Sequence, residues 1–177
     1  MVYYIGVNKL NIKLFNGEAK ELIDLLSTNE WHFHSNPHVT ANEIKEKVEK
    51  GYYSDDRETF WIIVDDQKLG ILIIDDIEDT IPLFDLRLTA NARGKGVGVQ
   101  TLHWLQNYLF GERRKIRIEG YTRADNLAMR KCFTNAGFVK EGYLRNAWEN
   151  ADGTIHDTVL YASISVSYTH LTLPTKA

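Results

Sequence analysis

The sequence predicts an α+β fold of the α/β/α kind, with a single mixed, mostly antiparallel sheet of about six to seven strands and helices on both faces. Segments that alternate apolar and polar residues, typical of strands, are interspersed with segments that show the apolar spacing of helices. After a first strand come two helices, antiparallel strands follow, and the chain then alternates strand–helix–strand–helix–strand–strand. No repeat or linker divides it, so we expect one domain over residues 1–165.

The first predicted elements are a strand at 10–15, where Leu, Ile and Leu alternate with other residues, and a helix at 18–26, where three leucines have helical spacing. A loop at 31–39 contains three histidines and a proline. Thr40 and Glu43 then form the pattern of a capping box, which predicts the start of a second helix.

That second helix is expected to end near Gly51. Strands at 59–64 and 68–74 flank an Asp-Asp-Gln turn, which indicates a hairpin. A further strand at 82–89 is followed by a glycine-rich turn and by a helix at about 98–110. These elements would form the centre of the sheet and the helix behind it.

The last third of the chain predicts a strand at 115–121 and a helix at 126–136 that Gly137 ends as a cap residue. Two final strands, 143–149 and 158–165, flank an Asp-Gly turn.

The composition is that of an ordinary soluble globular protein, with 44% hydrophobic residues, 25% charged residues and a net charge of -3. No basic patch dominates, so we expect no nucleic-acid partner. The longest apolar run, residues 69–74, is too short to span a bilayer, so no membrane partner is expected either. The only cysteine, Cys132, excludes an internal disulfide and fits a reducing compartment. The N-terminus lacks the features of a signal peptide, and we therefore expect a cytoplasmic protein.

Residues 166–177, VSYTHLTLPTKA, look foreign to the domain. The string VSYTHL resembles a translated read-through of a sequencing-library adapter. We interpret the segment as a non-native tail and leave it out of the fold prediction. A native polar tail is the alternative.

The most informative segment is the glycine-rich turn after the fourth predicted strand. Gly94, Gly96 and Gly98 come just before a helix, and Arg93 and Lys95 add positive charge. The first N–H groups of a helix have no internal partner and carry the positive end of the dipole, so this place suits a phosphate. The spacing matches neither a Walker A motif nor a dinucleotide-binding fingerprint. A plain tight turn is the alternative.

Two motifs stand one helix and one strand apart. The first, at 93–98, reads Arg-x-x-Gly-x-Gly. The second consists of Asn126-Leu-Ala-Met-Arg130, Gly137-Phe138, Glu141-Gly142 and Arg145. Together they resemble the GNAT superfamily of N-acetyltransferases, and the second motif resembles the branch that includes the ribosomal-protein N-terminal acetyltransferases. The resemblance covers about residues 10–165 and implies a GNAT-like fold.

The resemblance implies acetyl-CoA as co-substrate and assigns two backbone segments to it. The N–H of Leu86 would stabilise the oxyanion of the tetrahedral intermediate, and losing one such donor costs roughly 3 kcal/mol. Leu86 and Leu88 would also pair their backbone with the pantetheine arm. The residues expected to hold the pyrophosphate by backbone N–H groups are Arg93, Gly94, Lys95, Gly96, Val97 and Gly98.

Two further residues belong to the predicted cofactor site. Asn126 is expected both to cap its helix and, by the resemblance, to touch the pantetheine arm. Arg130 lies one turn along the helix and would either meet a phosphate or pair with Glu141.

An acceptor amine arrives mostly as ammonium, so a group must accept its proton. Glu119 is our first candidate because it lies on the strand after the phosphate-binding helix, where related enzymes often carry a glutamate. It would act directly or through water. The alternative is a carboxylate that pairs with Arg117 or Arg123.

Many GNAT enzymes protonate the departing thiolate with a tyrosine, and the matching position here is Phe133, which cannot donate a proton. Tyr121 or Tyr143 would substitute, or the thiolate would take its proton from the attacked nitrogen or from water. We predict that Tyr143, together with Glu119 and Leu86, is catalytic. A covalent role for Cys132 is disfavoured, because a cysteine beside an aromatic residue in a helix is typical of a core.

Residues 31–38, WHFHSNPH, fall where GNAT enzymes often place an acceptor-binding loop. Trp31 and His34 are the predicted substrate-binding residues, with ordinary loop packing as the alternative. No metal is predicted, because the histidines lack a fourth ligand or a cysteine cluster. The acidic stretches at 65–66 and 75–79 are expected to be solvated hairpin ends, and attraction of a polyamine is the alternative.

The sequence therefore predicts an acetyl-CoA-dependent N-acetyltransferase that acts on a primary amine by direct attack in a ternary complex. The acceptor is left open between a protein N-terminus and a small molecule such as an antibiotic, a polyamine or an amino acid. A non-catalytic acyl-CoA-binding module is a third hypothesis, and a homodimer is left open.

Overall fold

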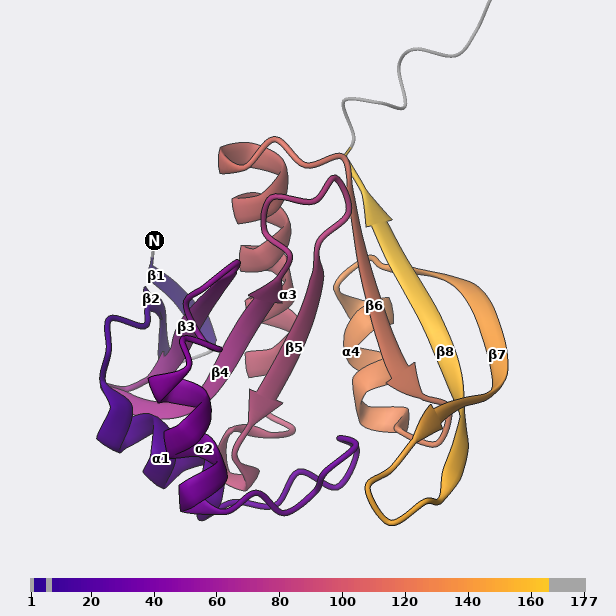
Figure 1. The fold of residues 1–177 in the computed structure, drawn as a ribbon. Helices are drawn as coiled ribbons and strands as arrows, with labels where there is room; N and C mark the ends of the chain where they lie inside the picture. The colour runs from indigo at the N-terminus through magenta and orange to yellow at the C-terminus, as the bar shows by residue number, and fades with distance from the viewer. Residues whose placement is uncertain (1, 6–7, 166–177) are drawn as a thin grey trace, which may run out of the picture.

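A computed structural model of the chain describes residues 2–5 and 8–165, and the predicted tail at 166–177 lies outside these residues (Figure 1). The strands are β1 (Val2–Ile5), β2 (Asn8–Leu14), β3 (Arg57–Val64), β4 (Gln67–Asp75), β5 (Leu83–Leu88), β6 (Arg117–Arg123), β7 (Val139–Glu149) and β8 (Ile155–Ile164). The helices are α1 (Ala19–Ser27), α2 (Ala41–Glu49), η1 (Ala90–Ala92), α3 (Val97–Gln106), its π-helical continuation η2 (Asn107–Glu112) and α4 (Leu127–Asn135).

The predicted α+β class is confirmed, and every predicted helix and strand is present with shifted ends. The largest shift is in β7, which begins at Val139 instead of residue 143. Strand β1 was not predicted; it pairs with β2 in antiparallel register. None of the described helices combines the length and the apolar character needed to cross a membrane.

The strands do not form the one continuous sheet that the sequence suggested. They form a five-stranded sheet in the order β1-β2-β3-β4-β5 and a three-stranded sheet in the order β6-β8-β7. All hydrogen-bonded neighbours are antiparallel. Strands β5 and β6, which α3 connects, run in the same direction and diverge toward their C-terminal ends (Figure 1). The sheet is therefore split between the two strands that carry the predicted site.

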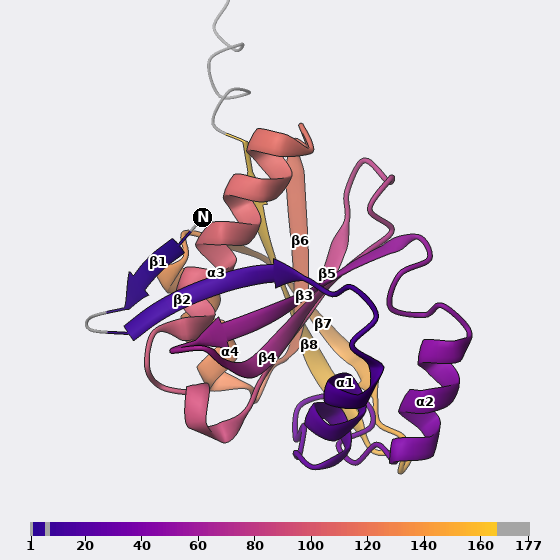
Figure 2. The same cartoon turned by 90° about the vertical axis from the view of Figure 1, so that its left-hand side faces the viewer.

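Helices cover both faces of the five-stranded sheet, as predicted. Figure 2 shows α1 and α2 on one side of it and α3 on the other. Alternation along β3 explains this arrangement: Trp61 packs with the residues of α1 and α2, whereas Phe60 and Ile62 pack with those of α3. Each face of the sheet thus has its own apolar cluster. The cluster on the α3 side continues into the three-stranded sheet through Ile118 and Val159.

Local signals in the sequence account for the element ends. The predicted capping box at α2 is present: the Glu43 carboxylate accepts from Thr40 N at 2.6 Å, and Glu43 N donates to the Thr40 hydroxyl at 3.2 Å. In the β3–β4 hairpin, Asp65 and Asp66 both have positive φ angles, 48° and 63°, which suits a tight two-residue turn.

Candidate active site

The glycine-rich segment after β5 has the geometry of an anion site. Gly94 and Gly96 have φ angles of 73° and 81°, in the left-handed region that favours glycine. Gly96 is the N-cap residue of α3, so the first N–H groups of that helix have no partner within it. These donors and the helix dipole favour a negatively charged group at this place.

Gly98 lets α3 and α4 approach each other. A Cβ atom at this position would lie 2.9 Å from Sγ of Cys132 on α4. Burial raises the pKa of Cys132 to about 12. The reactive thiolate form is therefore scarce, in line with the expectation that Cys132 is a packing residue.

The side chain of Arg93 fixes this loop to the rest of the molecule. Its Nε donates to the carbonyl oxygen of Leu88 at 2.8 Å, and its Nη2 donates to that of Glu30 at 3.2 Å. Arg93 therefore ties the end of β5 to the segment after α1. Any role in anion binding that uses its backbone is compatible with these bonds.

A cavity of about 490 Å³, here called the glycine-loop cavity, opens beside this segment. Its walls come from the loop after α1, from β5, from the glycine segment and from α4. Most of the predicted cofactor residues line it, namely Leu86, Leu88, Arg93, Gly94, Gly96, Gly98 and Asn126. Lys95, Val97 and Arg130 do not line it, whereas Lys131, which the sequence did not single out, does.

Among the described strands β5 pairs with β4 alone, so its other edge offers backbone donors to this cavity. Thr89 N donates to Leu69 O at 2.9 Å, and residues that bond to the neighbouring strand alternate in an antiparallel pair. In the observed register, Leu86 and Leu88 therefore direct their N–H groups away from β4. These N–H groups therefore point toward the split between β5 and β6. The N–H of Leu86 was predicted to donate a hydrogen bond to an oxyanion there.

Asn126 caps α4 as predicted. Its Oδ1 accepts from Met129 N at 3.1 Å, and its Nδ2 donates to the Thr122 hydroxyl at 3.1 Å. The residue also lines the glycine-loop cavity, so it caps the helix and contributes to the cavity wall.

Arg130 does not make the pairing that the sequence offered as an alternative. Its Nη1 donates to the carbonyl oxygen of Ala124 at 2.8 Å. Glu141 pairs with Arg117 instead. Arg130 thus supports the loop that precedes α4.

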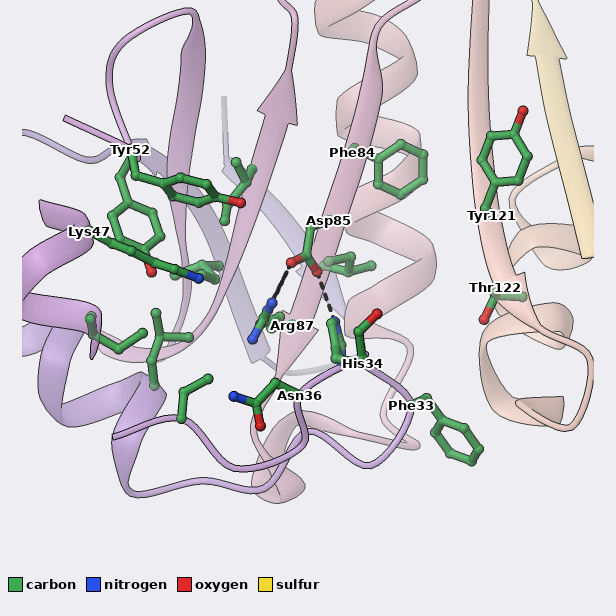
Figure 3. A pocket seen from close by; sticks show the side chains of 18 of the residues that line it. Phe33, His34, Asn36, Lys47, Tyr52, Phe84, Asp85, Arg87, Tyr121 and Thr122 are labelled. Atoms are coloured by element: carbon green, nitrogen blue, oxygen red, sulfur yellow. Dashed lines mark hydrogen bonds and ion pairs between the residues drawn. The ribbon is translucent and has the colours of Figure 1, made fainter. Parts of the chain in front are cut away.

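A second cavity of about 600 Å³ lies on the side of β5 that faces α1 and α2, and we call it the Asp85 cavity (Figure 3). Inside it, His34 Nε2 lies 2.8 Å from Asp85 Oδ1. Arg87 donates from Nε and Nη2 to Asp85 Oδ2 at 2.9 and 2.8 Å. Three side chains from two distant segments thus form one hydrogen-bonded cluster.

The charge state of this cluster follows from its contacts. Burial alone would raise the pKa of Asp85, but the charges of His34 and Arg87 and their hydrogen bonds outweigh it and hold that pKa below its ordinary value. Asp85 is therefore a carboxylate, which accepts from a hydrogen on His34 Nε2. In the neutral ring this assigns the lone pair to Nδ1, which is buried and has no hydrogen-bond partner among the described residues.

The loop at 31–38 is held across the split between the sheets. Arg123 of β6 donates to His32 O at 3.5 Å, and Ala151 N, beyond β7, donates to Ser35 O at 2.7 Å. These two contacts, at the end of the second sheet where β6 ends and β7 turns into β8, hold the loop that carries His34.

The two cavities meet beside β5. The residues that line both are Phe33, His34, Leu86, Asn126 and Met129. Among these shared residues His34 alone has a side chain that can act as an acid or a base. A group held in one cavity can therefore meet a group held in the other beside Leu86 and His34.

Glu119 does not reach this meeting point. It lies outside both cavities, its Oε1 accepts from Arg117 Nε at 2.7 Å, and its Oε2 accepts from the Tyr121 hydroxyl at 3.0 Å. The structure thus matches the alternative of a carboxylate paired with Arg117. Glu119 and Tyr121 share one face of β6, and Tyr121 rather than Glu119 lines the Asp85 cavity.

The two tyrosines proposed as proton donors, Tyr121 and Tyr143, lie in different places. The hydroxyl of Tyr143 donates to Asp157 Oδ2 at 2.6 Å on the outer part of β7, and Tyr143 lines neither cavity. Tyr121 lines the Asp85 cavity, although its hydroxyl is directed to Glu119. Phe133 lines the same cavity as a buried ring. The position that matches the usual tyrosine therefore lies at the cavity but carries no proton donor.

The two predicted substrate residues have different places. His34 lines both cavities, as just described. Trp31 is only 1% exposed, its Nε1 donates to Leu26 O at 2.9 Å, and it borders the glycine-loop cavity alone. Loop packing, the alternative to acceptor binding, therefore describes Trp31.

Sequence reasoning missed Asp85 and Arg87. Their signal was present, because two charged residues alternate with Phe, Leu and Leu along a strand that leads into the glycine segment. Charged side chains on one face of a central strand indicate a site on that face. Among the described residues, no group of three His, Cys, Asp or Glu side chains could hold a metal ion.

An opening that offers free backbone N–H groups, next to a helix N-terminus that suits a phosphate, fits an extended phosphate-bearing cofactor. A second cavity that meets it beside one of those N–H groups fits a transferase that brings such a cofactor and an acceptor together. Comparison with known proteins identifies the cofactor and the class.

The chain matches the family model described as acetyltransferase (GNAT) domain over residues 10–139, and it belongs to this family. It is thus an N-acetyltransferase that uses acetyl-CoA as co-substrate, as the resemblance implied. No match was found among curated protein sequences.

Solved structures with the same fold cover nearly the whole chain. A probable acetyltransferase is 19% identical, with 94% of this chain and 98% of that chain covered and a TM-score of 0.74. Spermidine N-acetyltransferase from Vibrio cholerae, in complex with CoA and spermine, is 16% identical over 91% and 98% of the two chains, with a TM-score of 0.74. RimL, a ribosomal L7/L12 alpha-N-protein acetyltransferase in complex with coenzyme A, is 18% identical over 93% and 98%, with a TM-score of 0.77.

Proposed function

We propose that the enzyme transfers the acetyl group directly from acetyl-CoA to a primary amine within a ternary complex. The observation that carries this proposal is the meeting of the two cavities beside Leu86 and His34. The glycine-loop cavity would hold acetyl-CoA, and the Asp85 cavity would hold the acceptor. Direct attack needs both reactants in contact, and the shared wall provides the place.

The backbone of this chain would carry most of the cofactor binding. The N–H groups at the start of α3 would hold the pyrophosphate, and the free edge of β5 would pair with the pantetheine arm. Lys131 would add a positive charge at the wall of the cavity. The N–H of Leu86 would donate to the thioester oxygen as it becomes an oxyanion.

The proton of the acceptor would go to His34 in place of Glu119. His34 is held by Asp85 and lines both cavities, and its Nδ1 carries a lone pair that no described residue uses. An aspartate that orients a histidine and stabilises its charged form is a common device for general-base catalysis.

Acetyl transfer would proceed with every proton and electron pair accounted for by the two reactants, His34 and solvent. The ammonium loses one proton to solvent on entry, and the amine nitrogen then forms a bond to the thioester carbon while the carbonyl electron pair moves to oxygen. His34 takes a second proton from that nitrogen. The carbon–sulfur bond breaks, its electron pair leaves with sulfur, and the proton on His34 passes to the thiolate. This route needs no tyrosine at position 133.

The acceptor is a primary amine of a small molecule or of a protein N-terminus, both of which would place their amine in the Asp85 cavity. The named relatives include one enzyme of each kind. A homodimer in the cytoplasm is compatible with this assignment, and one relative is described as dodecameric.

The test is calorimetric titration of the full chain with acetyl-CoA, with ATP and NAD as controls, followed by detection of free thiol with a panel of amines. We expect micromolar binding of acetyl-CoA alone and thiol release with at least one amine. Binding without release on any amine would support the alternative of a non-catalytic binding module. A folded protein that does not bind acetyl-CoA would contradict the cofactor site itself.

A further inference from the structure

The acceptor cavity carries a charge pattern that discriminates between amines, and this inference rests on the proposed function. The charged side chains that line the Asp85 cavity come from α2 and β5. They are Glu43, Glu46, Lys47, Lys50, Asp85 and Arg87. Their formal charges cancel, so what matters is which of them still has bonding capacity to offer.

The acidic side chains in this set are already engaged. Glu43 accepts from the backbone and hydroxyl of Thr40 in the capping box. Glu46 pairs with Lys50 at 3.7 Å. Asp85 accepts from His34 and Arg87. Only Asp85 has both a place deep in the cavity and further lone pairs, because each carboxylate oxygen accepts up to two hydrogen bonds.

Two cations keep unused donors. Arg87 uses Nε and Nη2 on Asp85, while its Nη1 makes no hydrogen bond among the described residues and is not buried. Lys47 has no carboxylate within 4.0 Å in the described part of the chain, and its Nζ lies 4.9 Å from the centre of the Tyr52 ring. Both side chains extend into the cavity (Figure 3).

The wall also carries several aromatic side chains. They include Phe33, Tyr52, Phe84, Tyr121 and Trp148. Such a surface suits an apolar or aromatic side chain.

We propose that the acceptor is an α-amino acid with an apolar or aromatic side chain, whose free carboxylate is bound by Arg87. Its ammonium would meet Asp85, and its carboxylate would meet Nη1 of Arg87, two residues further along β5. Leu86 lies between them, so the nitrogen would be held next to the predicted oxyanion donor. A polycation would instead bring like charge against Arg87 and Lys47, which disfavours polyamines.

The first experiment uses matched amines. Thiol release from acetyl-CoA is measured with L-phenylalanine, L-phenylalaninamide, 2-phenylethylamine and spermidine. The amide keeps the side chain and imitates a protein N-terminus, and 2-phenylethylamine lacks any group at the carboxylate position. We expect kcat/KM for phenylalanine to exceed that of each other amine by at least about tenfold, the effect of one lost charge-assisted hydrogen bond. Equal or better turnover of the amide, of 2-phenylethylamine or of spermidine would overturn the proposal.

The second experiment changes the carboxylate site. Arg87→Lys keeps a positive partner for Asp85 but lacks the second edge of the guanidinium, so it should bring kcat/KM for phenylalanine close to that for phenylalaninamide. Lys50→Gln is the control, because Lys50 lines the same cavity but is paired with Glu46. Retention of the preference in a folded Arg87→Lys protein would contradict the assignment of Arg87.

A third measurement separates this proposal from the proposed function. In the presence of CoA, the binding of N-acetyl-L-phenylalanine and of N-acetyl-2-phenylethylamine is compared by calorimetry, which requires no turnover. Preferential binding of the carboxylate supports the proposal even if no amine releases thiol, and that second result would count against the proposed function alone. Equal binding of the two products would overturn the proposal.

Discussion

The glycine-loop cavity and the Asp85 cavity are built in different ways although they share a wall. The first has its predicted binding groups in the backbone of the stretch from β5 to α3, and the loop after α1 and α4 complete its walls. The second presents side chains from the loop at 31–38, from α2, from β5 and from β6. A backbone site recognises a constant cofactor, whereas a side-chain site can change from one family member to another. The backbone site therefore indicates the family of the protein, and the side-chain site indicates its acceptor.

We expect the largest effect from a substitution in the backbone half of the site, at the glycine-loop cavity. Gly96→Asp places a carboxylate and a Cβ atom at a left-handed position beside the predicted pyrophosphate site. Like charges brought together cost several kcal/mol, so affinity for acetyl-CoA should fall by at least about 100-fold. Calorimetry measures this. Gly153→Asp, at a φ of 80° in the β7–β8 turn, imposes the same backbone strain away from the cavity and should bind normally.

The next effect breaks the side-chain half while leaving the backbone half intact. His34→Gln can still donate to Asp85 but cannot accept a proton. We expect kcat to fall roughly 100-fold or more, the usual contribution of a general base, with acetyl-CoA affinity unchanged. His38→Gln is the control, because His38 belongs to the same loop but lines neither cavity. Full activity of His34→Gln would return the proton-acceptor role to another group.

A packing change tests β6, which lines the Asp85 cavity through Tyr121 and Thr122. A Cβ atom at Gly120 would lie 2.5 Å from Cζ of Phe133, so Gly120→Ala should lower the free energy of unfolding by about 1–3 kcal/mol. Urea denaturation measures this. The Cβ of Gly142→Ala would meet Leu160 at an ordinary 3.4 Å, and this variant should be distinctly less destabilised. Equal stability of the two variants would contradict the close contact of β6 with α4.

The smallest effect concerns the residue that the sequence favoured. Glu119→Gln removes a charge from the network with Arg117 but lies outside both cavities. We expect kcat to change by less than about threefold and the free energy of unfolding by about 1 kcal/mol or less, as for other ion pairs near the surface. A loss of turnover as large as that of His34→Gln would restore Glu119 as the proton acceptor.

The fold class could be predicted because its signals are local. Leucine spacing predicted α1, the Thr40 and Glu43 pair predicted the start of α2, and turn residues located the hairpins. The split between β5 and β6 was not visible in this way. Pairing of two distant strands depends on how α3 and α4 pack beneath them, and no periodicity within either strand records that packing.

The sequence by itself determined the backbone half of the site. Glycines at 94, 96 and 98 are required where φ is positive or where a helix approaches closely, so their spacing records the geometry directly. Only the tertiary structure decided the side-chain half. It brought His34 to Asp85 across 51 positions of the chain and paired Glu119 with Arg117. The physical reason is that the position of a side chain relative to distant segments depends on side-chain pairing and loop anchoring, which act only once the whole core is packed.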